Sequence, residues 1–122
     1  MLEHVRRLAP EEACGLLAGV SEQVERVYLI ENIRHSPYDY FMDPDQQVRA
    51  MLEIDAVGWA VNGIFHSHPA GPPVPSLTDV NQAFYPEAVY VIWARDGGPE
   101  WGMRGFEIDA GRVREVPIEV RP

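Results

Sequence analysis

The sequence predicts a single α/β domain over residues 1–122, in which helices flank a mixed β-sheet. Its 122 residues are enough for one hydrophobic core. An apolar fraction of 46% and a charged fraction of 24% are typical of globular domains. Helical patterns occur early and in the middle of the chain, with short apolar strand patterns between and after them. Alternation of this kind favours a mixed sheet with helices packed on its faces.

Helices are expected at three places. From Leu2 to Leu8 apolar residues recur at helical spacing, and Pro10 ends the helix or kinks it. Asp43 and Pro44 begin a second helix, as N-cap and first helical residue. Residues 76–84 read as a short third helix. The second helix has one expected apolar stripe, made of Val48, Met51, Leu52 and Ala56.

The expected strands are short apolar segments bounded by turn residues. Ala88–Ala94 is apolar on both faces, which is typical of a central strand. Residues 32–40 should be irregular, residues 97–99 a turn, and residues 69–75 a rigid loop because prolines cannot donate to a ladder. The other strands are Cys14–Val20, Val24–Ile30, Val61–His68, and a hairpin of Met103–Ile108 and Arg112–Val120 around Ala110-Gly111.

The stretch HSHPAGPPVPSLTD indicates a metal centre. His66 and His68 are two residues apart on a strand, so their rings share one face. Asp79 follows the proline loop of residues 69–75, which is expected to bring its carboxylate back toward the two histidines. Three N/O ligands with an open fourth position suit a catalytic zinc, whereas a structural zinc usually needs four ligands that include thiolates. The alternative is that Ser76 caps a helix and Asp79 complements its dipole, as in a capping box.

Hydrolysis at such a centre also needs a group that takes and returns a proton. Glu11 and Glu12 lie directly before the Cys14–Val20 strand, where a carboxylate could reach the end of a neighbouring strand. The alternative is that both belong to a helix first turn, which favours acidic residues. Their positions alone do not choose between the two glutamates.

These residues together resemble the JAMM (MPN-plus) zinc metalloproteases, most of all the small stand-alone prokaryotic members. The similarity rests on PEEACGLLAG from Pro10, on HSHP from His66, on Ser76-x-x-Asp79, and on FMDP before the middle helix. The resemblance implies a cytidine-deaminase-like fold. Members commonly carry a leading strand before the first helix, whereas here Met1 already lies in that helix. Either the domain is trimmed or the start site is late, and one layer is expected to be thinner or completed by a partner chain.

The resemblance also implies a role for each residue. His66, His68 and Asp79 would bind one Zn²⁺ per chain, Glu12 would hold the water and move its proton, and Ser76 would donate to the oxyanion. Ser67 and Pro69 would be structural. The implied substrates are ubiquitin-like or sulfur-carrier proteins with a Gly-Gly tail, cleaved at a peptide or isopeptide bond. The insertions that grip ubiquitin chains in eukaryotic relatives have no room here.

Charge and apolar content argue against nucleic-acid binding and against a membrane span. All ten basic residues are arginines, the formal charge is −9, and no basic cluster indicates nucleic-acid binding. No segment is long and apolar enough for a membrane span, and the N-terminus has no signal-peptide pattern. Cys14 is expected to be a small buried hydrophobe. With no second cysteine for an internal disulfide, we expect a cytoplasmic protein.

Two alternative functions and the oligomeric state also have to be considered. The main alternative function is a non-catalytic MPN-type scaffold. Metal content separates it from the hydrolase, since a protein that never retains zinc would support the scaffold. A nucleoside deaminase would need H-x-E with Pro-Cys-x-x-Cys, which the chain lacks. A homodimer is an open expectation. His4 and His35 have no evident partners and are expected to be solvated.

Overall fold

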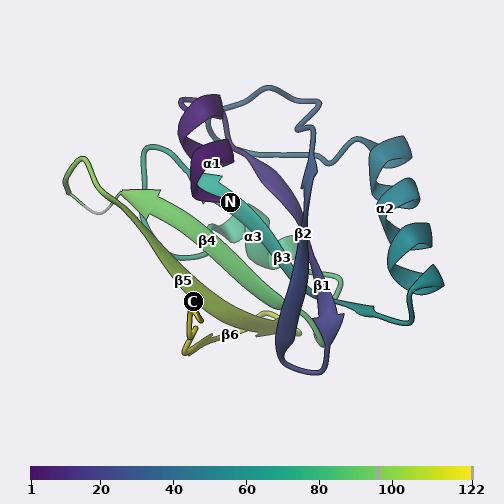
Figure 1. Cartoon of the computed structure of the whole chain (residues 1–122). Coiled ribbons are helices and arrows are strands. Elements are labelled where there is room, and N and C mark those ends of the chain that lie inside the picture. The colour runs from purple at the N-terminus through teal and green to yellow at the C-terminus, as the bar shows by residue number, and fades with distance from the viewer. Residues whose placement is uncertain (96, 122) are drawn as a thin grey trace.

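A six-stranded mixed sheet forms the centre of the computed structural model, which describes residues 1–95 and 97–121 (Figure 1). The strand order is β2-β1-β3-β4-β5-β6; β3 and β4 are parallel and the other pairs are antiparallel. The strands are β1 (Cys14–Val20), β2 (Gln23–Ile30), β3 (Ala60–His68), β4 (Val89–Arg95), β5 (Trp101–Asp109) and β6 (Arg112–Val116). The expected mixed sheet is confirmed, with β4 inside it.

Three helices accompany the sheet: α1 (Leu2–Leu8), α2 (Pro44–Ala56) and α3 (Leu77–Asn81). In Figure 1, α1 lies in front of the sheet and α3 is seen behind it. Among the described residues no helix is long and apolar enough to cross a membrane. The order in the chain gives the parallel pair β3–β4 its crossover through α3, as a parallel connection requires.

Two hydrophobic clusters pack on opposite faces of the sheet because side chains alternate along each strand. The larger cluster joins Leu16, Ile64 and Ile92 of the sheet to Ala50 and Ile54 of α2. The smaller cluster contains Leu17, Phe65 and Val91, with Met1 and Trp93 packed against it. Cys14, His66 and His68 alternate in phase with Leu16 and Ile64, so the histidines belong to the α2 face.

The smaller cluster depends on a close approach at Gly15. A Cβ at this position would lie 2.2 Å from the carbonyl oxygen of Tyr28 and 2.3 Å from the ring of Phe65. No side chain fits in that space, so glycine allows the Phe65 ring to lie flat against β1. The packing holds β1 and β3 together three residues after Glu12.

The helix α2 begins as expected but presents a different face. Asp43 caps it by accepting from the backbone N–H groups of Asp45 and Gln46. The expected stripe is wrong: Val48 is 55% exposed and Leu52 is 65% exposed. The buried positions are instead Ala50 and Ile54, with Met51 partly buried beside them.

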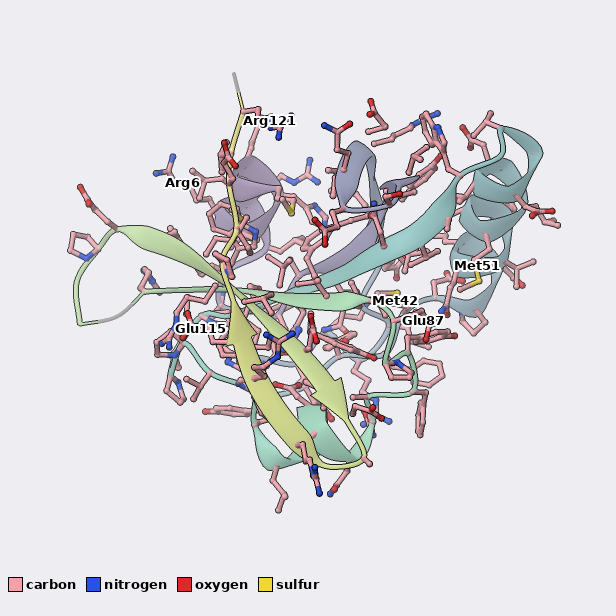
Figure 2. All side chains as sticks on the ribbon, turned by 90° about the horizontal axis from the view of Figure 1, so that it is seen from below. Arg6, Met42, Met51, Glu87, Glu115 and Arg121 are labelled. Atoms are coloured by element: carbon pink, nitrogen blue, oxygen red, sulfur yellow. The ribbon has the colours of Figure 1, made fainter. Side chains whose placement is uncertain are left out.

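Two elements are shorter than expected. The helix α3 ends at Asn81 rather than at residue 84. The strand β6 ends at Val116 rather than Val120, since Pro117 cannot donate to the ladder. The segment beyond it turns back over the sheet, where Ile118 contacts Gly105. Figure 2 shows Arg121 on the same side of the sheet as Arg6 of α1.

The β5–β6 hairpin closes where the sequence indicates. Asp109 pairs with Arg112, and the two residues between them have positive φ, 51° at Ala110 and 81° at Gly111. Positive φ at both central positions is the type I′ turn, whose twist matches that of a hairpin.

Candidate metal centre

The candidate site lies where the start of β1 meets the end of β3. Cys14 is opposite His66 in this antiparallel pair, and beyond it the N–H of Ser67 donates to the carbonyl of Ala13 at 3.0 Å. Continuing this register by one step brings Glu12 beside His68. Alternate residues share a face, so Glu12 and the two histidines project to the same side of the sheet.

Three ligand-type atoms converge at this point. The Nε2 atoms of His66 and His68 are 2.9 Å apart, and Asp79 Oδ2 lies 3.2 Å from the first and 3.0 Å from the second. Both rings are almost fully buried, and Asp79 is nearly so. The sequence-predicted ligand set is therefore brought together from β3 and from the start of α3.

The separations fit a tetrahedral ion. Ligand atoms about 2.0–2.1 Å from a tetrahedral Zn²⁺ are about 3.3 Å from one another. The three observed separations are shorter than this by a few tenths of an ångström, so a small outward movement would seat the ion. A larger ion with six to eight oxygen ligands, such as Ca²⁺, does not match two imidazoles at this spacing.

The protonation of His68 also suits a metal ligand. Its Nδ1 lies 2.8 Å from the carbonyl oxygen of Pro72. A carbonyl only accepts, so Nδ1 carries the proton and donates. When the ring is neutral, this leaves a lone pair on Nε2 for a metal ion; when the ring is protonated, the Nε2–H donates to Asp79 Oδ2 at 3.0 Å. A hydrogen bond from the second ring nitrogen to a carbonyl is the usual way in which proteins orient a metal-binding histidine.

Asp79 carries the negative charge of the centre. Burial disfavours its ionised form, but hydrogen bonds from His66 and His68 outweigh burial and hold the pKa of this carboxyl well below its usual range. Burial lowers the pKa of His66. Burial also opposes the charge of His68, yet its contacts with Asp79 and Pro72 leave its pKa raised. An ionised Asp79 facing the two rings is suited to be the anionic ligand of the set.

Glu12 differs from Asp79 in its electrostatics. A carboxylate oxygen of Glu12 and one ring nitrogen of each histidine all lie within 4.8 Å of one another. Glu12 is only 3% exposed, and its Oε1 has no hydrogen-bond partner among the described residues. Burial raises its pKa to about 8, so the carboxyl can hold a proton near neutral pH. A carboxyl with this pKa suits proton transfer, whereas Asp79 suits ligation.

The two glutamates before β1 are now distinguished by position. Glu11 points away from the histidines, with its Oε1 3.3 Å from Nδ1 of the exposed His35. Glu12 is held from both sides of its backbone: its N–H donates to Ser36 O at 2.8 Å, and its carbonyl accepts from Asn32 Nδ2 at 3.0 Å. Only Glu12 therefore has its carboxyl at the centre.

Ser76 and Asp79 form a capping box, and the same capping box also lies at the candidate metal centre. Ser76 Oγ accepts from the N–H of Asp79 at 3.1 Å, and the N–H of Ser76 donates to Asp79 Oδ2 at 2.8 Å. That same Oδ2 faces both histidines. The cap and the ligand set are thus one arrangement rather than alternatives. Since Ser76 Oγ accepts in the cap, its own proton is available to donate to another group.

The remaining residues of the motif are structural. Ser67 is fully buried on the opposite face from the histidines, and its Oγ accepts from Ala13 N at 2.8 Å. Pro69 accepts from Arg95 Nη2 at 3.1 Å, which ties the proline loop to the end of β4. Cys14 is buried as expected; its thiol donates to Ile30 O at 3.4 Å, and burial raises its pKa to about 12.

Sequence reasoning missed two residues of the site, Asn32 and Tyr40. Asn32 is buried and uses its amide to join the backbone of Glu12 to the loop of residues 34–41. The ring of Tyr40 stacks on that of His66. Both come from a segment without periodicity. The one available signal was an asparagine two residues after the end of the expected strand Val24–Ile30.

The expectation that the other two histidines are solvated was wrong for His4 and is confirmed for His35, although His35 does have partners. His4 is only 8% exposed, with Arg7 Nη2 3.3 Å from its Nδ1, because α1 presses it against Phe65. His35 is exposed but has partners, since it lies within 3.5 Å of carboxylate oxygens of Glu11 and Glu31. A cavity of about 300 Å³ is lined by both of these histidines and by Glu11, Glu12 and Glu31.

Known proteins similar to this chain match it over nearly its whole length. The CysO-cysteine peptidase of Mycobacterium tuberculosis is 38% identical over 125 residues, which cover 98% of this chain and 84% of that protein. The desampylase of Haloferax volcanii is 35% identical over 127 residues, covering 98% and 88%. The solution structure of a Desulfitobacterium hafniense protein superposes with a TM-score of 0.86 at 38% identity, covering 99% of this chain and 86% of that one. The family model described as prokaryotic homologs of the JAB domain matches residues 1–107. The chain therefore belongs to this JAB-domain family.

Proposed function

We propose that this protein is a zinc-dependent hydrolase that cleaves a peptide or isopeptide bond after the Gly-Gly tail of a ubiquitin-like or sulfur-carrier protein. One observation carries the hydrolytic part: three ligand atoms converge within 3.2 Å beside a buried carboxyl that can hold a proton. The relatives named above support the carrier as substrate, since their names describe a CysO-cysteine peptidase and a desampylase. We place the reaction in the reducing cytoplasm.

Each candidate site residue has its own part in the proposed hydrolysis. His66, His68 and Asp79 hold the ion, which when bound supplies a Lewis acid and lowers the pKa of a water molecule toward neutrality. Glu12 takes a proton from the attacking water and delivers it to the leaving amine. Ser76 donates its hydroxyl proton to the oxygen of the scissile carbonyl as negative charge develops there.

An extended tail suits these groups, because they are buried or half-buried. Glycine residues have no Cβ, so a Gly-Gly tail can pass a narrow opening that larger residues would block. The half-buried Ser76 and the buried histidines place the reacting groups below the surface. A thin, flexible tail with a folded carrier behind it is the substrate shape that suits such a site.

The test uses the protein loaded with Zn²⁺ and a carrier protein fused through its Gly-Gly terminus to a peptide, or joined to a lysine of a second protein. We expect cleavage directly after the second glycine. Glu12→Gln should retain zinc and lose most turnover, whereas His68→Ala should lose both. Glu11→Gln is the matched control, because that carboxyl points toward His35. Zinc bound at one per chain without cleavage of either substrate would contradict the proposal.

A further inference from the structure

The two histidines at the centre are oriented by different means. His68 has a hydrogen bond from Nδ1 to Pro72 O, as noted above. His66 has none: its Nδ1 is buried and has no partner among the described residues. Metal-binding histidines almost always donate their second nitrogen to a carboxylate, carbonyl or water, which fixes the ring plane. Something else must therefore orient the ring of His66.

Tyr40 lies where it can orient the ring of His66. Its ring lies against that of His66, with centroids 4.7 Å apart and an interplanar angle of 30°. The edge of the His68 ring closes a second side, at a centroid distance of 4.7 Å and an angle of 67°. Rotation of His66 about its Cβ–Cγ bond would drive the imidazole into the Tyr40 ring. Such rotation would also carry Nε2 away from Asp79.

Tyr40 is itself held firmly by Asn32. The Nδ2 of Asn32 donates to the carbonyl of Asp39 at 3.1 Å, and its Oδ1 accepts from the N–H of Phe41 at 3.1 Å. The residues on both sides of Tyr40 are thus bound to one buried side chain. The same Nδ2 also donates to the carbonyl of Glu12, so the Tyr40 backbone and the Glu12 backbone share an anchor.

We propose that Tyr40 is the positioning residue of His66: the face of its ring holds the imidazole in the plane that directs Nε2 at the ion. This inference rests on the proposed function only in taking His66 as a metal ligand. Stacking supplies at His66 the restraint that a hydrogen bond supplies at His68. The ring, rather than the Tyr40 hydroxyl, performs this role.

The test compares Tyr40→Leu and Tyr40→Phe with Tyr38→Leu. Tyr38 is a matched control, since it lies two residues earlier in the same loop and is 80% exposed. Zinc affinity is measured by competition with a chromophoric chelator, and ligand geometry by the visible absorption bands of the Co²⁺-substituted protein. Loss of an orienting partner typically weakens metal affinity by about 10- to 100-fold. We expect this loss and altered Co²⁺ bands for Tyr40→Leu, with wild-type values for Tyr40→Phe and Tyr38→Leu.

Two results would overturn the inference. One is Tyr40→Leu binding zinc as tightly as the wild type with unchanged Co²⁺ bands. The other is Tyr40→Phe losing as much affinity as Tyr40→Leu, because the hydroxyl would then be responsible. Wild-type protein that binds no zinc would instead contradict the proposed function, so the two failures are distinguishable.

A measurement on the wild type guards against a variant that does not fold. In the metal-free protein, the stacked tyrosine ring should shift the ring protons of His66 upfield relative to those of exposed His35 in the NMR spectrum. Absence of that shift would refute the stacked arrangement without any substitution. Tyr40→Met, which keeps apolar bulk without a ring, should fold where the leucine variant does not and should show the same loss of affinity.

Discussion

Ser67 Oγ accepts a hydrogen bond from the backbone N–H of Ala13 at 2.8 Å. The bond joins the residue between the two histidines to the residue after Glu12, on the face of the sheet opposite the metal centre. It adds to the ladder bond in which Ser67 N–H donates to Ala13 O at 3.0 Å. A buried serine on the opposite face thus ties the backbone beside Glu12 to the strand that carries His66 and His68.

Replacement of this serine should destabilise the fold. Ser67→Ala leaves the buried Ala13 N–H without an acceptor, so we expect unfolding free energy to fall by about 1–3 kcal/mol. Urea unfolding of the metal-free protein measures it. Ser36→Ala is the control, because Ser36 Oγ accepts from Tyr38 N–H in an exposed turn. Equal stability of both variants would show that the Ala13 N–H finds another partner.

Asp79 should be separable into its capping and ligating roles. Asp79→Asn keeps an amide oxygen that can accept from Ser76 N–H, but it removes the negative charge. We expect this variant to fold and to retain far less zinc after dialysis, measured by elemental analysis. Asp43→Asn makes the same change at the cap of α2, where it should leave zinc content unaltered. Full zinc retention in Asp79→Asn would point to Glu12 as the third ligand.

Glu12 should make the metal-free protein less stable as the pH rises. Its folded-state pKa of about 8 lies above its ordinary value of 4.5, so between these values the folded state binds more protons than the unfolded state. Stability from this group is therefore fully present below about pH 4.5 and is lost as pH rises toward about 8. Glu12→Gln should remove that loss, making the variant more stable than the wild type at pH 8. Parallel pH profiles of chemical denaturation for the two proteins would contradict it.

Ser76 should affect turnover without affecting zinc binding. Removal of one oxyanion donor typically lowers kcat by about 10²–10³-fold. Ser76→Gly is the cleanest change, because glycine at an N-cap costs only a few tenths of a kcal/mol. Steady-state kinetics with a cleavable carrier fusion give kcat, and elemental analysis gives zinc content. Unchanged kcat would assign Ser76 to capping alone.

Cys14 should be chemically silent in the folded protein. Its thiol is buried, donates to Ile30 O, and has a pKa raised to about 12. Since the thiolate is the reactive form, alkylation by iodoacetamide at pH 8 should proceed only in denaturant. Mass spectrometry before and after addition of urea measures it. Rapid labelling of the native protein would show that the thiol is accessible and reactive.

The convergence of His66, His68 and Asp79 could be predicted from sequence because their relationship is local. His66 and His68 share a strand, and the proline loop that returns Asp79 is too short and stiff to place it far away. The position of Glu12 depended on pairing between β1 and β3, which no local pattern shows. Its assignment over Glu11 came from the resemblance to JAMM proteases, and the structure distinguishes them by direction.

The parts that escaped prediction depend on tertiary packing. In α2 the spacing of Val48 and Leu52 indicated a stripe, but the helix turns Ala50 and Ile54 to the sheet. Helical spacing permits either face, and only contact with the sheet chooses. Tyr40 escaped for a similar reason, since its partner His66 lies in another element.

The pairing of Cys14 with His66 makes the spacing of the reacting groups a property of the backbone. Deleting or inserting one residue between Glu12 and Cys14 would turn the carboxyl to the α1 side, away from both imidazoles, while most of the hydrophobic interior stayed intact. Such a molecule should still fold and still capture its ion. It would be a well-formed zinc protein with no means of moving a proton.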